Sequence, residues 1–120
     1  MFFPEGQLRV WLYQPAVDMR RSFDGLAAIA KNQMQEDPLS GHLFVFINKR
    51  RTYLKVLFFD RSGYCIWAKR LEAGQFGVVS NMVTGNKQAL DFVALKLLID
   101  GLEHKDFRQR KRLHLTNNNC

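Results

Sequence analysis

The stretch from residue 42 to residue 71 constrains the fold of this chain more than any other part of its sequence. Residues 42–48, 52–60 and 64–71 are rich in β-branched and aromatic side chains, and they are separated by Lys49-Arg50-Arg51 and Arg61-Ser62-Gly63. Connections this short suit tight hairpins between antiparallel strands. The sequence therefore predicts an antiparallel meander over residues 42–71, within a sheet of three to four strands.

Both faces of this meander are apolar. Because side chains alternate across a strand, Leu43, Val45 and Ile47 face one way while Phe44 and Phe46 face the other. The next strand repeats the pattern, with Leu54, Val56 and Phe58 opposite Leu57 and Phe59. A sheet with two apolar faces cannot leave one of them in water, so helices, the N-terminal strand segment or a second subunit should cover each side.

A strand and a helix are predicted before the meander. Residues 8–13 mix β-branched, aromatic and polar side chains, which indicates a short strand ending near Pro15. A helix is predicted near residues 19–35, with an apolar face of Phe23, Leu26, Ala27, Ala30 and Met34. Either Asp18 or Ser22 can serve as its N-cap, and it should end before Pro38.

A C-terminal helix is predicted near residues 87–100. Its expected N-cap is Asn86 and its expected C′ residue is Gly101. Its predicted apolar face consists of Leu90, Val93, Ala94, Leu97 and Leu98. The connection over residues 72–87 shows weak periodicity, and we expect it to include a short strand around Val78-Val79.

These elements predict an α+β fold in a single domain. A chain of 120 residues that is 47% hydrophobic is expected to form one core. We expect the domain to span residues 1–107 and to be followed by a basic, flexible tail at 108–120. No stretch approaches the roughly 20 apolar residues of a membrane span, and no secretory signal is evident. With Cys65 and Cys120 as the two cysteines, no disulfide framework is expected, which favours a cytoplasmic protein.

The net charge of +7 is concentrated in two segments. Residues 42–71 carry seven basic groups and one acidic group, and residues 103–120 carry five and two. The other two segments, residues 1–41 and 72–102, each sum to −1. A concentrated positive field attracts polyanions, of which nucleic acid is the commonest. A solvated basic face without a ligand is the alternative that charge alone leaves open.

The cations gather at the tip of the first predicted hairpin. A two-stranded ribbon is narrow enough to enter a major groove, and arginine can bind phosphate through two parallel N–H bonds. The candidate nucleic-acid-binding residues are Lys49, Arg50, Arg51, Lys55, Lys69 and Arg70, with Arg108, Arg110, Lys111 and Arg112 from the tail. Charged tips also keep hairpins soluble, so a purely structural interpretation stays open.

Motifs for catalysis, metals or cofactors are not found in the sequence. His42, His104 and His114 have no zinc-ligand spacing, and no glycine-rich phosphate loop is present. Asp18, Asp24, Asp37 and Asp60 suit helix starts and turns better than a divalent-metal site. Cys65 lies mid-strand, where an inert thiol is usual. We therefore expect a protein that is not an enzyme, with no catalytic residue, metal, cofactor or small-molecule substrate.

Several blocks of the sequence resemble one known family. Residues 15–27 read PAVDMRRSFDGLA, and they are followed in order by DPLSGHLFVF at 37–46, NKRR at 48–51, LKVL at 54–57 and WAKRLE at 67–72. This series resembles the TnpB accessory proteins of IS66-type bacterial insertion sequences over roughly residues 8–112, with a looser match at 73–90. The resemblance implies an accessory role beside a separate transposase, with no chemistry of its own and no known site to transfer.

Two functional hypotheses follow. In the first, this accessory protein binds element DNA or the transposase–DNA assembly through the basic hairpin and tail. In the second, it is a protein-interaction module that docks the transposase or another accessory protein without touching DNA, by way of the aromatic sheet face. A homodimer is compatible with either. The block Asp18-Met19-Arg20-Arg21 is either an interaction site or a structural element, with Asp18 as a helix cap and an arginine paired with an acid.

Overall fold

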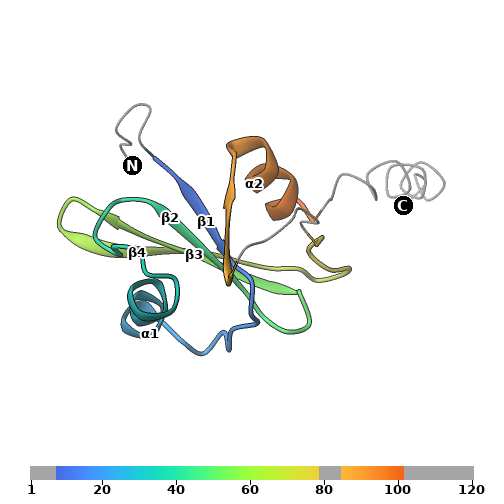
Figure 1. The fold of residues 1–120 in the computed structure, drawn as a ribbon. Coiled ribbons are helices and arrows are strands. Elements are labelled where there is room, and N and C mark those ends of the chain that lie inside the picture. The colour runs from blue at the N-terminus through green and yellow to red at the C-terminus, as the bar shows by residue number, and fades with distance from the viewer. Residues whose placement is uncertain (1–7, 79–84, 102–120) are drawn as a thin grey trace.

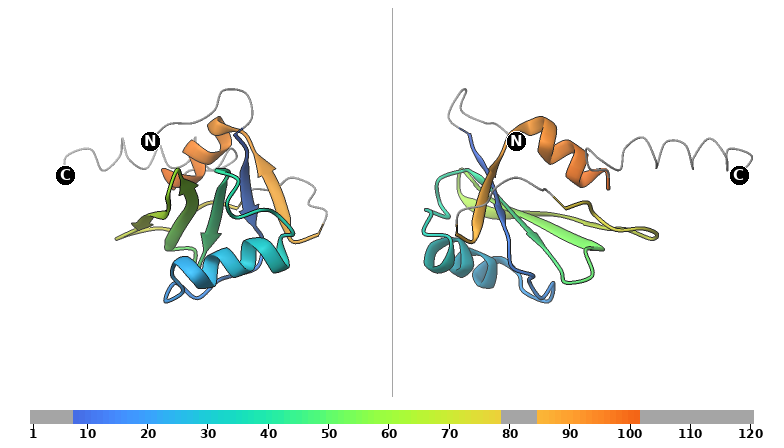
Figure 2. Two further views of the ribbon diagram at one scale, coloured as in Figure 1. Left: turned by 90° about the vertical axis from the view of Figure 1, so that its left-hand side faces the viewer. Right: turned by 45° about the vertical axis from the view of Figure 1, so that its right-hand side comes forward.

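The protein folds around one five-stranded sheet with a helix on each face (Figures 1 and 2). The computed structural model describes residues 8–78 and 85–101. The strands are β1 (Val10–Tyr13), β2 (Leu43–Ile47), β3 (Tyr53–Asp60), β4 (Gly63–Arg70) and β5 (Lys87–Leu90). Their order across the sheet is β4-β3-β2-β1-β5. The predicted tail at 108–120 lies outside the described residues.

The predicted meander is confirmed. Strand β2 pairs antiparallel with β3, and β3 pairs antiparallel with β4 in an unbroken register from Tyr53 opposite Arg70 to Asp60 opposite Gly63. Arg51 and Arg61, one in each connection, adopt positive φ angles of 58°, a conformation that such short turns often require of one residue.

The rest of the sheet differs from the prediction of a purely antiparallel sheet of three to four strands. Strand β1 lies between β2 and β5, and it runs parallel to β2, with Val10 opposite Leu43. A parallel neighbour requires a crossover connection, and the segment containing the first helix supplies it. The sheet is therefore mixed, and β1 is central rather than an edge.

The prediction of a helix starting near residue 87 is wrong at its N-terminal end. Lys87–Leu90 form β5, antiparallel to β1, and α2 spans Phe92–Ile99. Its N-cap is Asp91, whose side chain accepts a hydrogen bond from the Ala94 N–H at 2.7 Å, and not Asn86. Gly101 takes the predicted C′ position with φ 79°. Pairing with β1 overrides the helical propensity of Lys87-Gln88-Ala89-Leu90, because tertiary contacts outweigh such weak preferences.

The first helix is shorter than the predicted 19–35. Helix α1 spans Phe23–Ala28 and continues as a π-helical turn, η1, over Ile29–Gln33. Ser22 occupies the N-cap position without a side-chain hydrogen bond. Gln35, at φ 55°, ends the helix before Pro38, as the proline requires. The predicted strand around Val78 is not formed at that residue, and Val79 lies outside the described residues.

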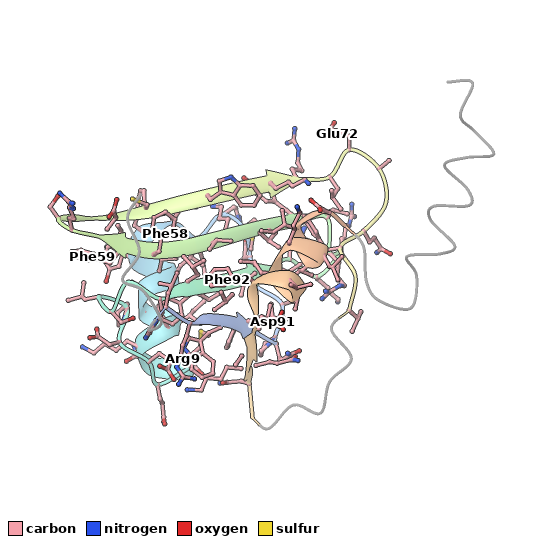
Figure 3. The ribbon with its side chains drawn as sticks, turned by 90° about the horizontal axis from the view of Figure 1, so that it is seen from above. Arg9, Phe58, Phe59, Glu72, Asp91 and Phe92 are labelled. Atoms are coloured by element: carbon pink, nitrogen blue, oxygen red, sulfur yellow. The ribbon has the colours of Figure 1, made fainter. Side chains whose placement is uncertain are left out.

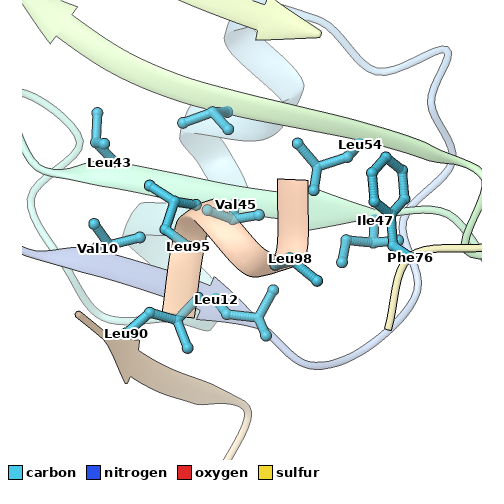
Figure 4. Close-up of a cluster of buried hydrophobic side chains, with 11 residues drawn as sticks. Val10, Leu12, Leu43, Val45, Ile47, Leu54, Phe76, Leu90, Leu95 and Leu98 are labelled. Carbon is cyan, nitrogen blue, oxygen red and sulfur yellow. The ribbon is translucent and has the colours of Figure 1, made fainter. Parts of the chain in front are cut away.

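The two apolar faces each have a separate core, as their alternation predicts. Residues of α2 and Phe76 cover the face that carries Val45 and Leu54, in a cluster of Val10, Leu12, Leu43, Val45, Ile47, Leu54, Val56, Phe76, Leu90, Leu95 and Leu98 (Figure 4). The opposite face packs on α1 and η1, in a cluster of Val17, Leu26, Ala30, Met34, Phe44, Phe46 and Leu57. Within the described residues, no helix has the length and apolar character to cross a membrane.

Candidate nucleic-acid interface

The tip of the β2–β3 hairpin is held by the side chain of Asn48. Its Oδ1 accepts hydrogen bonds from the backbone N–H groups of Thr52 at 2.9 Å and Tyr53 at 3.0 Å. The Arg51 N–H donates to the Asn48 carbonyl at 3.0 Å and closes the turn. Asparagine suits this position because its short side chain can satisfy backbone donors of a turn. The tip is therefore ordered from within, and Lys49 and Arg50 at its apex are exposed.

Arg51 points away from the apex and fastens the segment that follows β4. Its guanidinium donates to the carbonyl oxygen of Phe76 at 3.0 Å and to that of Gly77, while its own carbonyl accepts the Phe76 N–H at 2.6 Å. Phe76 is buried in the core beneath α2. Phosphate binding by Arg51 would therefore compete with the hydrogen bonds that Arg51 makes with the backbone of Phe76.

Lys55 holds the loop that leads into α1. Its Nζ donates to the carbonyl oxygens of Met19 at 2.7 Å and Arg21 at 2.8 Å, and it lies 5.8 Å from the centre of the Tyr53 ring. These bonds join positions 34 and 36 residues apart in the chain. The block Asp18-Met19-Arg20-Arg21 is consequently fixed against β3.

Lys69 and Arg70, at the end of β4, lie at the same end of the sheet as the tip. Lys69 Nζ donates to the Ile99 carbonyl at 2.8 Å, at the C-terminal end of α2, where a cation complements the helix dipole. Arg70 Nε lies 3.4 Å from a carboxylate oxygen of Glu72, and both side chains are largely exposed. Such an exposed pair is weak, so Arg70 remains accessible to another anion.

Lys49 and Arg50 face the 16–20 loop across a shallow groove. The groove is lined by Ala16, Val17, Asp18, Met19, Arg20, Asn48, Lys49, Arg50 and Tyr53. Among the described residues, the side chains of Lys49 and Arg50 form no hydrogen bond or ion pair. The structure thus brings together two of the predicted cations and adds Arg20, which the sequence analysis had treated only as part of the Asp18–Arg21 block.

Arg20 is paired with Asp18 on the wall of this groove. Its Nε and Nη2 donate to both carboxylate oxygens at 2.6 to 3.1 Å, and its backbone N–H donates to Oδ1 at 2.9 Å. These hydrogen bonds lower the pKa of Asp18 to about 2. The predicted pairing of an arginine with a neighbouring acid is confirmed, whereas Asp18 does not cap α1, which begins at Phe23. With one acid against Arg20, Lys49 and Arg50, the groove keeps a positive excess.

The acidic candidates do not gather at one site: Asp24 and Asp37 line one groove beside Tyr64, whereas Asp18 lines another. Asp18 lines the groove near the tip, beside Tyr53 at the start of β3, and Asp60 is the last residue of that eight-residue strand, whose two ends are about 23 Å apart. Asp37 accepts the Leu39 N–H at 2.9 Å within its own turn. Within residues 8–78 and 85–101, no group of three or more histidine, cysteine or acidic side chains is placed to hold a metal ion.

Two further candidate residues, His42 and Cys65, have defined places. His42 Nδ1 accepts the backbone N–H of Arg9 at 3.0 Å, and Cys65 is a half-buried free thiol on β4. The tail candidates Arg108, Arg110, Lys111 and Arg112 lie outside the described residues, as do His104 and His114.

Comparison with known proteins gives a consistent result along the chain. A family model described as "IS66 Orf2 like protein" matches residues 8–109. The uncharacterized protein y4hO of Sinorhizobium fredii is 36% identical over 101 residues, covering 83% of this chain and 86% of the relative. Protein y4jC of the same organism, also uncharacterized, is 37% identical over 76 residues, covering 63% and 65%. No solved structure matches the chain.

Proposed function

Because the chain belongs to the IS66 Orf2-like family of insertion-sequence accessory proteins, we propose that it assists transposition without catalysis by contacting element DNA, or the transposase–DNA assembly, through its basic hairpin tip. The observation that carries this proposal is the exposed, unpaired state of Lys49 and Arg50, seen among the described residues, beside Arg20. Exposed cations on a rigid turn can reach phosphates without first breaking internal hydrogen bonds.

The contact surface is narrower than the ten predicted residues. Arg51, Lys55 and Lys69 already donate to backbone carbonyls, so binding a phosphate would leave those oxygens without a partner. Lys49, Arg50 and Arg70 are therefore the predicted phosphate ligands among the described residues, with Arg20 at the edge of the surface. The tail cations Arg108, Arg110, Lys111 and Arg112 remain part of the proposal.

Salt dependence of binding to duplex DNA tests this proposal. If about four phosphates are neutralised, log K against log[salt] should have a slope of about −3.6. The double variant Lys49→Glu with Arg50→Glu should reduce the magnitude of this slope to about 1.8 or below. The matched control is Arg61→Glu with Lys31→Glu, which reverses two exposed charges away from the tip. Equal slopes for the two double variants, or a binding constant that ignores salt, would refute the proposal.

A protein-docking role without DNA contact is the second candidate. The aromatic sheet face expected to dock a partner is not available, because Phe44 and Phe46 are fully buried beneath α1. Phe92 and Val93 on α2, 54% and 70% exposed, offer a different apolar surface (Figure 3). Capture of the transposase that survives nuclease treatment and is lost in Phe92→Ser with Val93→Ser would favour this second role.

The absence of catalysis is also a proposal with a direct test. A metal-dependent nuclease needs carboxylates that converge on one or two cations, and Asp18 and Asp60 lie near opposite ends of β3, while Asp24 and Asp37 line a different groove from Asp18. We expect the purified protein to leave DNA intact in Mg²⁺ or Mn²⁺. Cleavage that disappears in Asp18→Ala or Asp60→Ala would overturn this expectation.

A further inference from the structure

Strand β4 forms a long, open edge of the sheet. Among the described residues its one strand neighbour is β3, and the eight paired positions run without a bulge. Natural proteins usually protect such edges with proline, bulges, short strands or charges near the middle. None of these protects β4 between Gly63 and Ala68, and its two charges, Lys69 and Arg70, lie at its end.

The hydrogen-bond alternation identifies which backbone groups of β4 point outward. The Leu71 N–H donates to the Thr52 carbonyl at 2.8 Å, so this pair is a hydrogen-bonded one. In an antiparallel ladder hydrogen-bonded pairs alternate with non-hydrogen-bonded pairs. The residues whose N–H and C=O groups point away from β3 are therefore Tyr64, Ile66, Ala68 and Arg70.

A large aromatic side chain lies in the middle of this edge. Trp67 is 44% exposed and lies opposite Val56, on the face that carries α2. Helix α2 leaves this part of β4 uncovered, and Phe58 lies on the same face nearby (Figure 3). An exposed tryptophan beside backbone donors and acceptors that pair with no other described strand is suited to burial against another strand.

We propose that the edge of β4 binds the same edge of a second copy of this chain, in an antiparallel pair with its two-fold axis at Trp67. Outward groups must meet outward groups, and this register pairs all four such residues: Tyr64 with Arg70 of the second copy, and Ile66 with Ala68 of the second copy. On the order of eight backbone hydrogen bonds form, two for each of the four pairs.

The side chains fit this register. The two Trp67 residues face each other in a non-hydrogen-bonded pair, where Cα atoms approach to about 4.5 Å and side chains are closest. Lys69 lies opposite Cys65 of the second copy and Arg70 opposite Tyr64, so no two like charges are directly opposed. A parallel arrangement would instead place the four cations of the two strand ends side by side. Self-complementarity of this kind is what a two-fold interface requires.

The dimer has a consequence for the basic tips, although the inference does not depend on their function. Each tip lies at the end of the sheet where its own β4 finishes. Antiparallel pairing therefore places the two tips at opposite ends of the joined sheet. Dimerisation and DNA binding can be measured separately, so failure of one does not imply failure of the other.

Sedimentation analysis of the full chain without DNA tests the interface. We expect a dimer, and we expect Ala68→Pro to raise the dissociation constant of this dimer by at least about tenfold. Proline removes an outward backbone donor while the hydrogen bonds to β3 remain. Ala68→Ser, which keeps the donor, is the matched control. Trp67→Lys, at an exposed position, is a second variant that opposes two cations on the axis and should also give monomers.

A disulfide tests the register. In a chain with Cys65→Ser and Cys120→Ser, Trp67→Cys should form an intermolecular disulfide on mild oxidation, because Cα atoms in such a pair are within bonding range. Ser62→Cys, beyond the end of the strand, should not. A monomeric wild-type chain, a dimer unaffected by Ala68→Pro and Trp67→Lys, or equal crosslinking at positions 67 and 62 would overturn the proposal.

Discussion

The guanidinium of Arg51 donates to two backbone carbonyls, whereas Arg61 has the same positive φ in an exposed turn and no such contact among the described residues. This pair separates a structural cation from a surface one. We expect Arg51→Ala to lower the free energy of unfolding by about 1–3 kcal/mol, because it leaves partly buried carbonyls unsatisfied. Arg61→Ala should change it by less than about 0.5 kcal/mol. Equal effects in denaturant titrations would contradict the assigned role of Arg51.

The carboxyl group of Asp18 provides a pH-dependent prediction. Hydrogen bonds from Arg20 lower its pKa from the ordinary 3.8 to about 2 in the folded protein. A group with a depressed folded pKa contributes stability above its unfolded pKa and loses that contribution as the pH falls through the folded value. The contribution of Asp18 should therefore be present above pH 3.8 and disappear toward pH 2.

Titration of the Asp18 carboxyl by NMR measures this shift directly. We expect a midpoint near 2 in the wild-type chain and a return toward 3.8 in Arg20→Ala, because the variant removes the side-chain hydrogen bonds. Arg21→Ala, which alters only a weaker charge interaction, is the control. An ordinary midpoint in the wild-type chain would mean that the Asp18–Arg20 pair does not form in solution.

At the scale of elements, the structure begins α2 after Asp91, whereas the sequence pattern predicted Asn86 as the N-cap. Asp91→Ala should cost about 1 kcal/mol of stability, within the 0.5–2 kcal/mol typical of a lost N-cap, because the Ala94 N–H loses its acceptor. Asp100→Ala, at the other end of the same helix, makes a suitable control. If Asn86 were the cap, Asp91→Ala would have no effect in thermal unfolding.

The sequence predicted those elements that depend on local patterns. Alternation in β2 and β3 correctly assigned Leu43 and Phe44 to opposite cores, and Gly101 marked the end of α2. It did not predict β5, because a four-residue strand is specified by its pairing with β1 and not by its own composition. The parallel placement of β1 likewise depends on a crossover that leaves no periodic signal.

The candidate site was predicted only in part for a related reason. Composition located the cations at the β2–β3 turn, and the structure confirms that Lys49 and Arg50 are exposed there. Composition could not show that the Lys55 amino group donates to carbonyl oxygens 34 and 36 residues away in the chain. It also could not show that Arg20 lies across the groove from the tip. Hydrogen bonds between distant segments decide which cations are free, and sequence spacing does not encode them.

At the scale of the whole molecule, the two helices leave the sheet with a basic end and an open edge. The tip carries Lys49 and Arg50, and Arg70 lies at the same end of the sheet on the outermost strand. The other exposed turn, around Arg61, lies at the opposite end of β3. Contact with a polyanion should therefore be confined to one end of each chain, and it should not spread evenly over a surface with net charge +7.

Backbone NMR of the chain with a short DNA duplex is the most direct measurement of that central claim. At low salt, we expect the largest amide shifts at residues 48–51, with smaller ones at Arg20 and Arg70, and little change at residues 60–63 on the opposite turn. Lys49→Glu with Arg50→Glu should abolish the shifts at the tip. Shifts of equal size at both turns, or shifts confined to α2, would contradict a polyanion-binding hairpin.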